Sequence, residues 1–91
     1  MIKISKRLET IASLVSINSK VIDIGCDHGL LDIYLYQNKI ASKIIASDIN
    51  ENALNNAKQN IQKYKLNKQI ETRLGNGLEI LKDNDDVNTI V

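Results

Sequence analysis

The sequence predicts an α/β fold built around a parallel β-sheet. Short apolar runs that are typical of buried strands alternate with segments of helical periodicity. The first run leads into a glycine turn, Gly25-Cys-Asp-His-Gly29, at which a helix can begin. The second run ends in a carboxylate, Asp48, which lies 23 positions after Gly25. Strands that alternate with helices in this way pair in parallel through right-handed crossovers.

The first part of the chain is expected to form a helix, a strand and a second helix. Apolar residues at steps of three and four predict an amphipathic opening helix, with Ser5 as a possible N-cap: Ile4, Leu8, Ile11 and Val15. The run Lys20–Gly25 predicts a strand that is covered on both faces. A helix that opens at the glycine turn then contains Leu30, Leu31, Ile33, Tyr34 and Leu35.

The second part is expected to repeat the alternation. Lys43–Asp48 predicts a second strand, and Asn50 is a credible N-cap for the helix marked by Leu54, Ala57, Ile61 and Tyr64. A third strand places apolar and polar residues on opposite faces: Ile70, Thr72 and Leu74 against Glu71 and Arg73.

The last residues predict a break, an exposed loop and a fourth strand. Gly75-Asn-Gly77 ends the third strand, a short helical turn follows, and the acids of Asp83–Asp86 predict an exposed loop rather than a metal site. Val87–Val91 begins a fourth strand, which is expected on the far side of the first strand, at the point where ligands bind in such sheets.

Length and composition limit the possible classes of protein. With 91 residues the chain is at most one domain, and 12 basic against 11 acidic residues provide no strong field for nucleic acid. The single Cys26 cannot form an internal disulfide, which fits a reducing compartment. No apolar run approaches the roughly 20 residues of a membrane span, and no signal peptide is visible. We therefore expect a cytoplasmic protein without a membrane or metal partner.

The glycine turn discriminates between cofactor classes. The spacing to Asp48 is close to the roughly 20 residues that place an acid over a nucleoside ribose. A dinucleotide fingerprint needs a glycine where the backbone meets pyrophosphate, but Asp27 stands there. A carboxylate repels a diphosphate and is compatible with a cationic, phosphate-free nucleoside such as S-adenosylmethionine. The turn therefore predicts a methyltransferase type of cofactor site, and it disfavours a nicotinamide-dependent oxidoreductase.

Three blocks of the sequence resemble a known family. Ser5-Lys-Arg-Leu8 followed by Ile11-Ala12, Asp23-Ile-Gly-Cys-Asp-His28 and Arg73-Leu-Gly-Asn-Gly-Leu78 are similar to the bacterial tRNA (adenine-22-N1)-methyltransferases. The resemblance implies a Rossmann-like class I methyltransferase fold and S-adenosylmethionine as the cofactor. It also implies methylation of N1 of an adenine in tRNA. Two positions depart from the family pattern, namely Gly29 and Asp32, where alanine and proline are common.

The resemblance covers only the N-terminal part of such an enzyme. It implies that residues 1–91 are the N-terminal part of the methyltransferase domain, truncated after the start of the fourth strand. The remaining strands and a C-terminal coiled coil would be absent, and with them the part that holds the target base. A non-catalytic remnant with a partial cofactor site, or a methyltransferase for another substrate, therefore stay open as alternatives.

Within this resemblance, eight residues form the candidate cofactor site, and the catalytic residue is unknown. Asp23 would orient the methionine amine, Gly25 would let the backbone approach the cofactor, and Asp48 would accept from both ribose hydroxyls, with Ile49 beside it. Asp27 could offset the positive charge, and His28 could face the acceptor base. Asn76 and Gly77 would approach the adenine.

Structural alternatives exist for most of these residues. Asp23 could cap a backbone turn, Asp48 could help to cap the next helix, and Asn76 could be an ordinary left-handed turn residue. A lone histidine in a turn is often only a hydrogen-bonding residue. Cys26 is expected to be a small packing residue.

Two cations invite an RNA-binding interpretation. Lys6 and Arg7 are possible contacts to tRNA phosphates, and a solvated helix face is the alternative. The lysines at 58, 63, 65 and 68 are expected to be a solvated face only.

Overall fold

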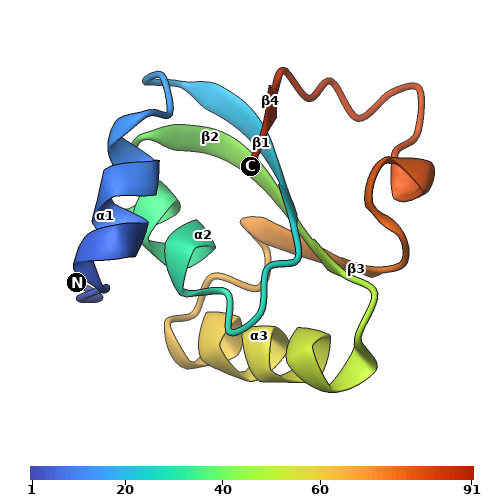
Figure 1. Ribbon diagram of the computed structural model, residues 1–91, viewed down its shortest axis with the longest axis horizontal. Coiled ribbons are helices and arrows are strands. Elements are labelled where there is room, and N and C mark those ends of the chain that lie inside the picture. Colours follow the sequence, from blue (N-terminus) through green and yellow to red (C-terminus); the bar gives the residue numbers. More distant parts are fainter.

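The computed structural model describes all residues 1–91, which form a four-stranded parallel sheet with helices packed on one face (Figure 1). The elements are α1 (Lys6–Ser13), β1 (Ser19–Ile24), α2 (Leu30–Gln37), β2 (Ala41–Asp48), α3 (Glu51–Lys63), β3 (Ile70–Leu74), the 3₁₀ turn η1 (Gly77–Ile80) and β4 (Thr89–Ile90). The strand order is β3-β2-β1-β4, so the chain moves outward to β3 and returns to the far side of β1. The predicted α/β class and parallel sheet are therefore confirmed.

Both predicted helix caps are present. The Ser5 hydroxyl accepts a hydrogen bond from the backbone N–H of Leu8 at 3.3 Å, and the Asn50 side chain accepts one from Ala53 at 3.0 Å. Each bond satisfies a backbone donor that has no partner within the first turn of a helix. The helices α1 and α3 therefore begin where the sequence predicts.

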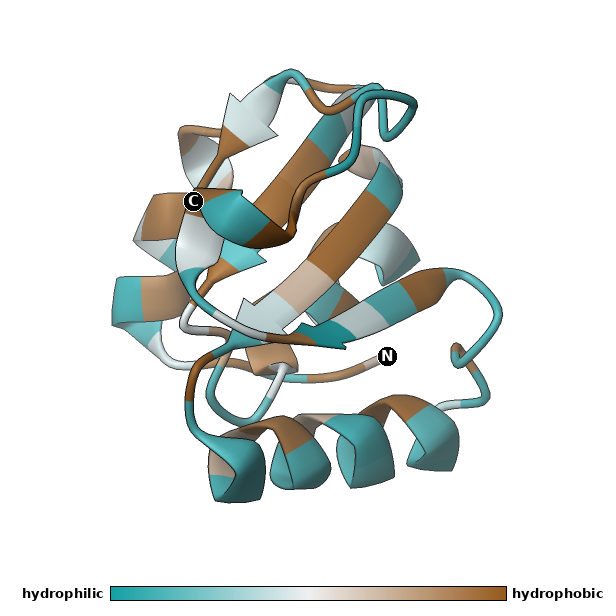
Figure 2. Cartoon of the chain, turned by 90° about the vertical axis from the view of Figure 1, so that its right-hand side faces the viewer, coloured by the Kyte–Doolittle hydropathy of each residue, from teal (hydrophilic) through white to brown (hydrophobic).

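The hydrophobic core lies between the sheet and the three helices. In Figure 2 the apolar side of α3 faces the sheet and its hydrophilic side faces outward. The core includes side chains from the strands β1 to β3 and from all three helices, among them Ala12, Val21, Leu35, Ile44, Ile61 and Ile70. Burial of one such large apolar side chain stabilises the fold by about 1.5–3 kcal/mol. None of the helices combines the length and the apolar character that a membrane crossing requires.

The opposite face of the sheet is covered by the segment between β3 and β4, drawn in orange to red in Figure 1. Ile22 and Ile45 are register partners on β1 and β2. They alternate with Val21 and Ile44 of the core, so they point to this opposite face. Both side chains are fully buried.

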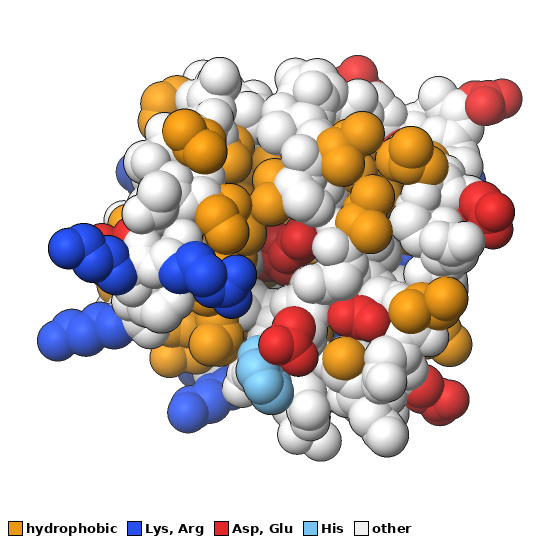
Figure 3. Space-filling view, viewed as in Figure 1, with side chains coloured by type: hydrophobic (Ala, Val, Ile, Leu, Met, Phe, Trp, Pro, Cys, Tyr) orange, Lys and Arg blue, Asp and Glu red, His pale blue; other side chains and the backbone are white.

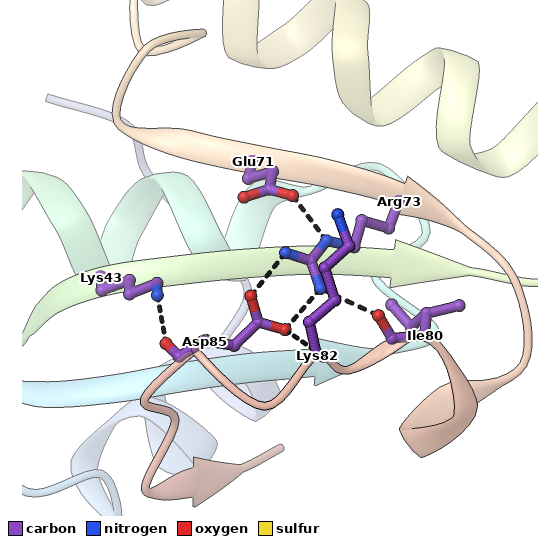
Figure 4. Close-up of polar contacts among 6 residues, drawn as sticks. All are labelled: Lys43, Glu71, Arg73, Ile80, Lys82 and Asp85. Atoms are coloured by element: carbon purple, nitrogen blue, oxygen red, sulfur yellow. Dashed lines mark hydrogen bonds and ion pairs between the residues drawn. The ribbon is translucent and has the colours of Figure 1, made fainter.

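An ion pair fastens this segment to the sheet (Figure 4). Arg73 of β3 donates to both carboxylate oxygens of Asp85, each at 2.7 Å, and to the carbonyl of Ile80 at 2.9 Å. The backbone N–H of Lys82 also donates to the Asp85 carboxylate, and the Lys43 ammonium donates to the backbone carbonyl of Asp85. The Arg73 guanidinium and then the Lys82 N–H hold the pKa of Asp85 well below its usual range.

The expectation of an exposed loop at Asp83–Asp86 is therefore wrong for Asp85, which is only 7% exposed. Asp83 and Asp86 do face solvent. The misassignment has a physical cause, because periodicity gives no information on which loop residue meets the arginine of a distant strand. No group of three or more histidine, cysteine or acidic side chains is placed to hold a metal ion.

Candidate functional site

A cavity of about 440 Å³ opens at the carboxyl end of β1, between α1, the glycine turn and Val91. It lies beside the point where β2 and β4 flank β1 on opposite sides, which is where ligands bind in open α/β sheets. Its size falls in the range of small-molecule sites. Figure 3 shows acidic side chains and the histidine gathered in and below a hollow on this face, with basic side chains to one side.

The glycine turn forms one wall of the cavity. Gly25 has φ +76°, a conformation that favours glycine, and an added Cβ would meet no atom within 4 Å. Open space therefore faces this backbone. At Gly29 the situation is different, because a Cβ would lie 3.1 Å from the Cβ of Ala57, so that glycine allows α2 to pack closely on α3.

Asp48 ends β2 with its carboxylate held by two backbone donors. Its Oδ2 accepts from the N–H of Asp27 at 3.1 Å, and its Oδ1 accepts from the N–H of Asn50 at 2.9 Å. Each carboxylate oxygen keeps a further acceptor position. The cap of α3 is Asn50, so Asp48 does not itself cap that helix. Asp48 is instead a fixed acceptor that joins the glycine turn to the end of β2.

Two buried acids lie behind the turn. Asp23 is 6% exposed and lines the cavity, and Asp32 in the first turn of α2 is fully buried. The two carboxyl groups affect each other's ionisation, and neither oxygen of Asp32 has a hydrogen-bond partner among the N–H and O–H groups of the protein. Burial, then the charge of Asp23 and the contact with it raise the pKa of Asp32 well above its usual value. Burial also raises the pKa of Asp23, whereas the contact with Asp32 lowers it.

Cys26 is packed in the core beside these acids. Its side chain is buried and belongs to the hydrophobic cluster. Burial, then the charges of Asp32, Asp23 and Asp48 raise the pKa of the thiol to about 12. The thiol therefore stays neutral, which fits the expected packing role and excludes a thiolate nucleophile at neutral pH.

The segment after β3 lies along the same edge of the sheet but does not line the cavity. The N–H of Gly75 donates to the carbonyl of Asp48 at 3.0 Å, and a Cβ on Gly77 would contact Ile24, which does line the cavity. Asn76 is exposed, with φ −89° and ψ 100°. The left-handed turn interpretation of Asn76 is therefore wrong, and the two flanking glycines have the positive φ angles instead.

The structure brings together only part of the candidate site. The cavity is lined by Asp23, Gly25, Asp27 and His28, and Asp48 is attached to it through the N–H of Asp27. The other three residues, Ile49, Asn76 and Gly77, lie outside the lining. His28 is half exposed, and its Nε2 lies 3.8 Å from a carboxylate oxygen of Asp27.

Sequence reasoning missed two features of the site. The helix α1 covers the cavity with Arg7, Leu8 and Ile11, whereas the sequence predicts a functional role only for Arg7, as an RNA contact. The complete burial of Asp32 against Asp23 was also missed. Its signal is a single acid within the apolar run Leu30-Leu-Asp-Ile33.

Comparisons with known proteins give consistent results. A family profile described as "Methyltransferase domain" matches residues 4–91. The tRNA (adenine(22)-N(1))-methyltransferase of Bacillus subtilis is 40% identical over 81 residues, which are 89% of this chain and 34% of that protein. The chain therefore spans about a third of the length of this relative.

Solved structures agree with the sequence comparison. M. capricolum TrmK in complex with S-adenosyl-homocysteine is 39% identical with a TM-score of 0.88, over 96% of this chain and 39% of that one. Streptococcus pneumoniae Sp1610 in complex with S-adenosyl-L-methionine is 36% identical with a TM-score of 0.91, over 97% and 41% of the two chains.

Proposed function

Since the chain belongs to the methyltransferase-domain family, we propose that it binds S-adenosyl-L-methionine and contributes the cofactor half of a tRNA (adenine-22-N1)-methyltransferase. The relatives that it resembles over most of its own length are described by that activity, and two similar structures contain the cofactor or its product. The observation that carries the proposal is the position of Asp48, fixed at the end of β2 with free acceptor positions beside the cavity.

The residues present fit the cofactor. Asp48 can accept from the two hydroxyls of a ribose, and Gly25 leaves open space at the backbone. Asp23 lies in the cavity, where it would face the methionine amine. Asn76 and Gly77, next to Asp48 along the same edge, would approach the adenine ring, and Ile49 would contact the nucleoside.

The charges of the site also suit this ligand. S-adenosyl-L-methionine carries a sulfonium and an ammonium group, and the cavity presents the carboxylates of Asp23 and Asp27. An opposite charge at short distance favours the bound cation, and a pyrophosphate at the same place would be repelled. This supports a methyl donor over a nicotinamide dinucleotide.

Methyl transfer to N1 of adenine does not require a catalytic base from the chain. The cofactor supplies an activated methyl group, and N1 of a neutral adenine carries its own lone pair. No side chain has to remove a proton before the attack. The residues of the cavity therefore act by orientation and by excluding water. Lys6 and Arg7 on the first turn of α1 would contact tRNA phosphates near the opening.

Transfer of a labelled methyl group tests the proposal. In a chimera that joins residues 1–91 to the remaining part of the Bacillus subtilis relative, we expect incorporation from S-adenosyl-L-methionine into a tRNA transcript with adenine at position 22, and none into the same transcript with guanine there. Equal incorporation into both transcripts would contradict the assigned substrate. Binding of S-adenosyl-L-homocysteine without any transfer would support the alternative of a non-catalytic cofactor-binding chain.

A further inference from the structure

Asp32 is a buried acid for which the fold supplies no conventional partner. It lies between Leu31 and Ile33 in the first turn of α2, and it is fully buried. Neither of its oxygens receives a hydrogen bond from any N–H or O–H of the protein. A buried carboxylate without hydrogen-bond donors is strongly disfavoured. The protonation state of Asp32 therefore decides whether this side chain can be buried here.

The titratable group that acts on Asp32 is the carboxyl group of Asp23, which is itself only 6% exposed. Two ionised carboxylates cannot hydrogen bond and repel each other, whereas one proton between them gives a donor and an acceptor. Other titratable groups near the pair are Asp48 at the end of β2 and the neutral thiol of Cys26 in the turn. Arg7 of α1, with Asp27 and His28, lines the same cavity. No cation forms an ion pair with either acid.

The two acids differ in their access to the cavity. Asp23 lines it and keeps a small exposed area, but Asp32 is sealed behind it. The proton is therefore best held by Asp32, because bulk solvent does not reach its carboxyl group. Asp23 can then remain ionised and face a ligand. The hydrogen bond from Asp32 favours this state, because it lowers the pKa of Asp23 against the effect of burial.

We propose that Asp32 is a positioning residue that keeps its proton and donates a hydrogen bond to Asp23, which fixes the Asp23 carboxylate for an ammonium group in the cavity. The proposal rests on the proposed function, in which that ammonium is the amine of S-adenosyl-L-methionine. Asp32 touches no ligand itself, and it acts through the orientation and the ionisation of Asp23.

Two substitutions of Asp32 separate positioning from packing. Asp32→Asn keeps a donor of the same size and cannot ionise. Asp32→Leu fills the site without a donor and leaves Asp23 buried and unpaired. Affinity for S-adenosyl-L-homocysteine, measured by calorimetry, is expected to stay within about threefold of the parent in Asp32→Asn. It is expected to fall about tenfold in Asp32→Leu, the factor for one lost charge-assisted hydrogen bond.

The pH profile gives a readout that a packing role would not change. Without its donor, Asp23 should ionise only at higher pH, so the affinity of Asp32→Leu should recover as the pH rises. Asp83→Asn, on an exposed loop, is the matched control and should follow the parent. A parent-like affinity and pH profile in folded Asp32→Leu would overturn the proposal.

The proton itself can be observed independently of any ligand. Infrared spectroscopy of the parent near neutral pH should show the carbonyl band of a protonated carboxyl group, and Asp32→Asn should lose it. Because the pKa of Asp32 is raised on folding, its contribution to stability is full below pH 3.8 and is lost as the pH rises through the folded value. The parent should therefore lose stability relative to Asp32→Asn as the pH rises.

These measurements distinguish the two possible failures. If the parent binds no S-adenosyl-L-homocysteine, the proposed function fails. The infrared band alone then tests whether Asp32 holds a proton. If the parent binds but shows no protonated carboxyl group, the proposal for Asp32 fails and the proposed function stands. If Asp32→Leu does not fold, the infrared band and the stability of Asp32→Asn decide the proposal.

Discussion

Replacing Asp48 with alanine is expected to weaken the binding of S-adenosyl-L-homocysteine by about 1–3 kcal/mol, or roughly 5- to 150-fold. The substitution removes the charged acceptor that is proposed to bind both ribose hydroxyls. Its carboxylate is held in place by the N–H groups of Asp27 and Asn50, so little freedom is lost when a ligand binds. Calorimetric titration of the folded variant measures the effect.

Asp48→Asn is the control for the structural role of the same side chain. It retains a carbonyl oxygen that can accept one of the two backbone N–H groups, but it loses the charge. We expect its affinity to lie between those of the parent and Asp48→Ala. An unchanged affinity in folded Asp48→Ala would remove Asp48 from the cofactor site.

Replacing Leu35 with alanine is expected to destabilise the fold by about 2–5 kcal/mol, because it opens a cavity in the core. Leu35 is fully buried in the cluster between the sheet and the helices. A domain of this length has a free energy of unfolding of about 5–14 kcal/mol from the per-residue average. The loss is therefore a large share of the total. Urea unfolding monitored by circular dichroism measures it.

Leu14→Ala provides the matched comparison. The chemical change is identical, but Leu14 is 81% exposed at the end of α1. A surface substitution of this kind changes the free energy of unfolding by no more than about 0.5 kcal/mol. Equal effects of the two substitutions would mean that the core is not where the structure places it.

The sequence predicts most of the fold because the relevant signals are local. The helix caps Ser5 and Asn50 precede apolar positions of helical period, and the strands are short apolar runs. The return of β4 to the far side of β1 follows from the general behaviour of doubly wound sheets. The local sequence pattern and the general rules for connecting strands were therefore sufficient to predict these helices and strands and the position of β4.

The candidate site is predictable only where its residues are contiguous or end neighbouring strands. Asp23, Gly25, Asp27 and His28 share one strand and turn, so they meet in the cavity. The parallel register of β1 and β2 brings Asp48 to the same edge. The sequence does not reveal that α1 folds over this edge, since an amphipathic helix can pack in several orientations.

The environments of Asp32 and Asp85 were the hardest features to predict. Asp32 and Asp85 each owe their environment to a residue on another element, namely Asp23 of β1 and Arg73 of β3. Composition and periodicity describe the neighbours of a residue along the chain and not across the fold. The sequence therefore predicts an exposed loop at Asp85 and gives no partner for Asp32.

A nucleoside cofactor is proposed to bind between the glycine turn and the end of β2. Amide NMR spectra of the ¹⁵N-labelled chain, titrated with S-adenosyl-L-homocysteine, test it most directly. We expect the largest changes at the backbone N–H groups of Gly25, Asp27 and Asn50 and in the Gly75–Gly77 segment, with residues at the far end of the sheet unaffected. Saturable binding with changes confined to another surface, or no changes at all, would contradict the account.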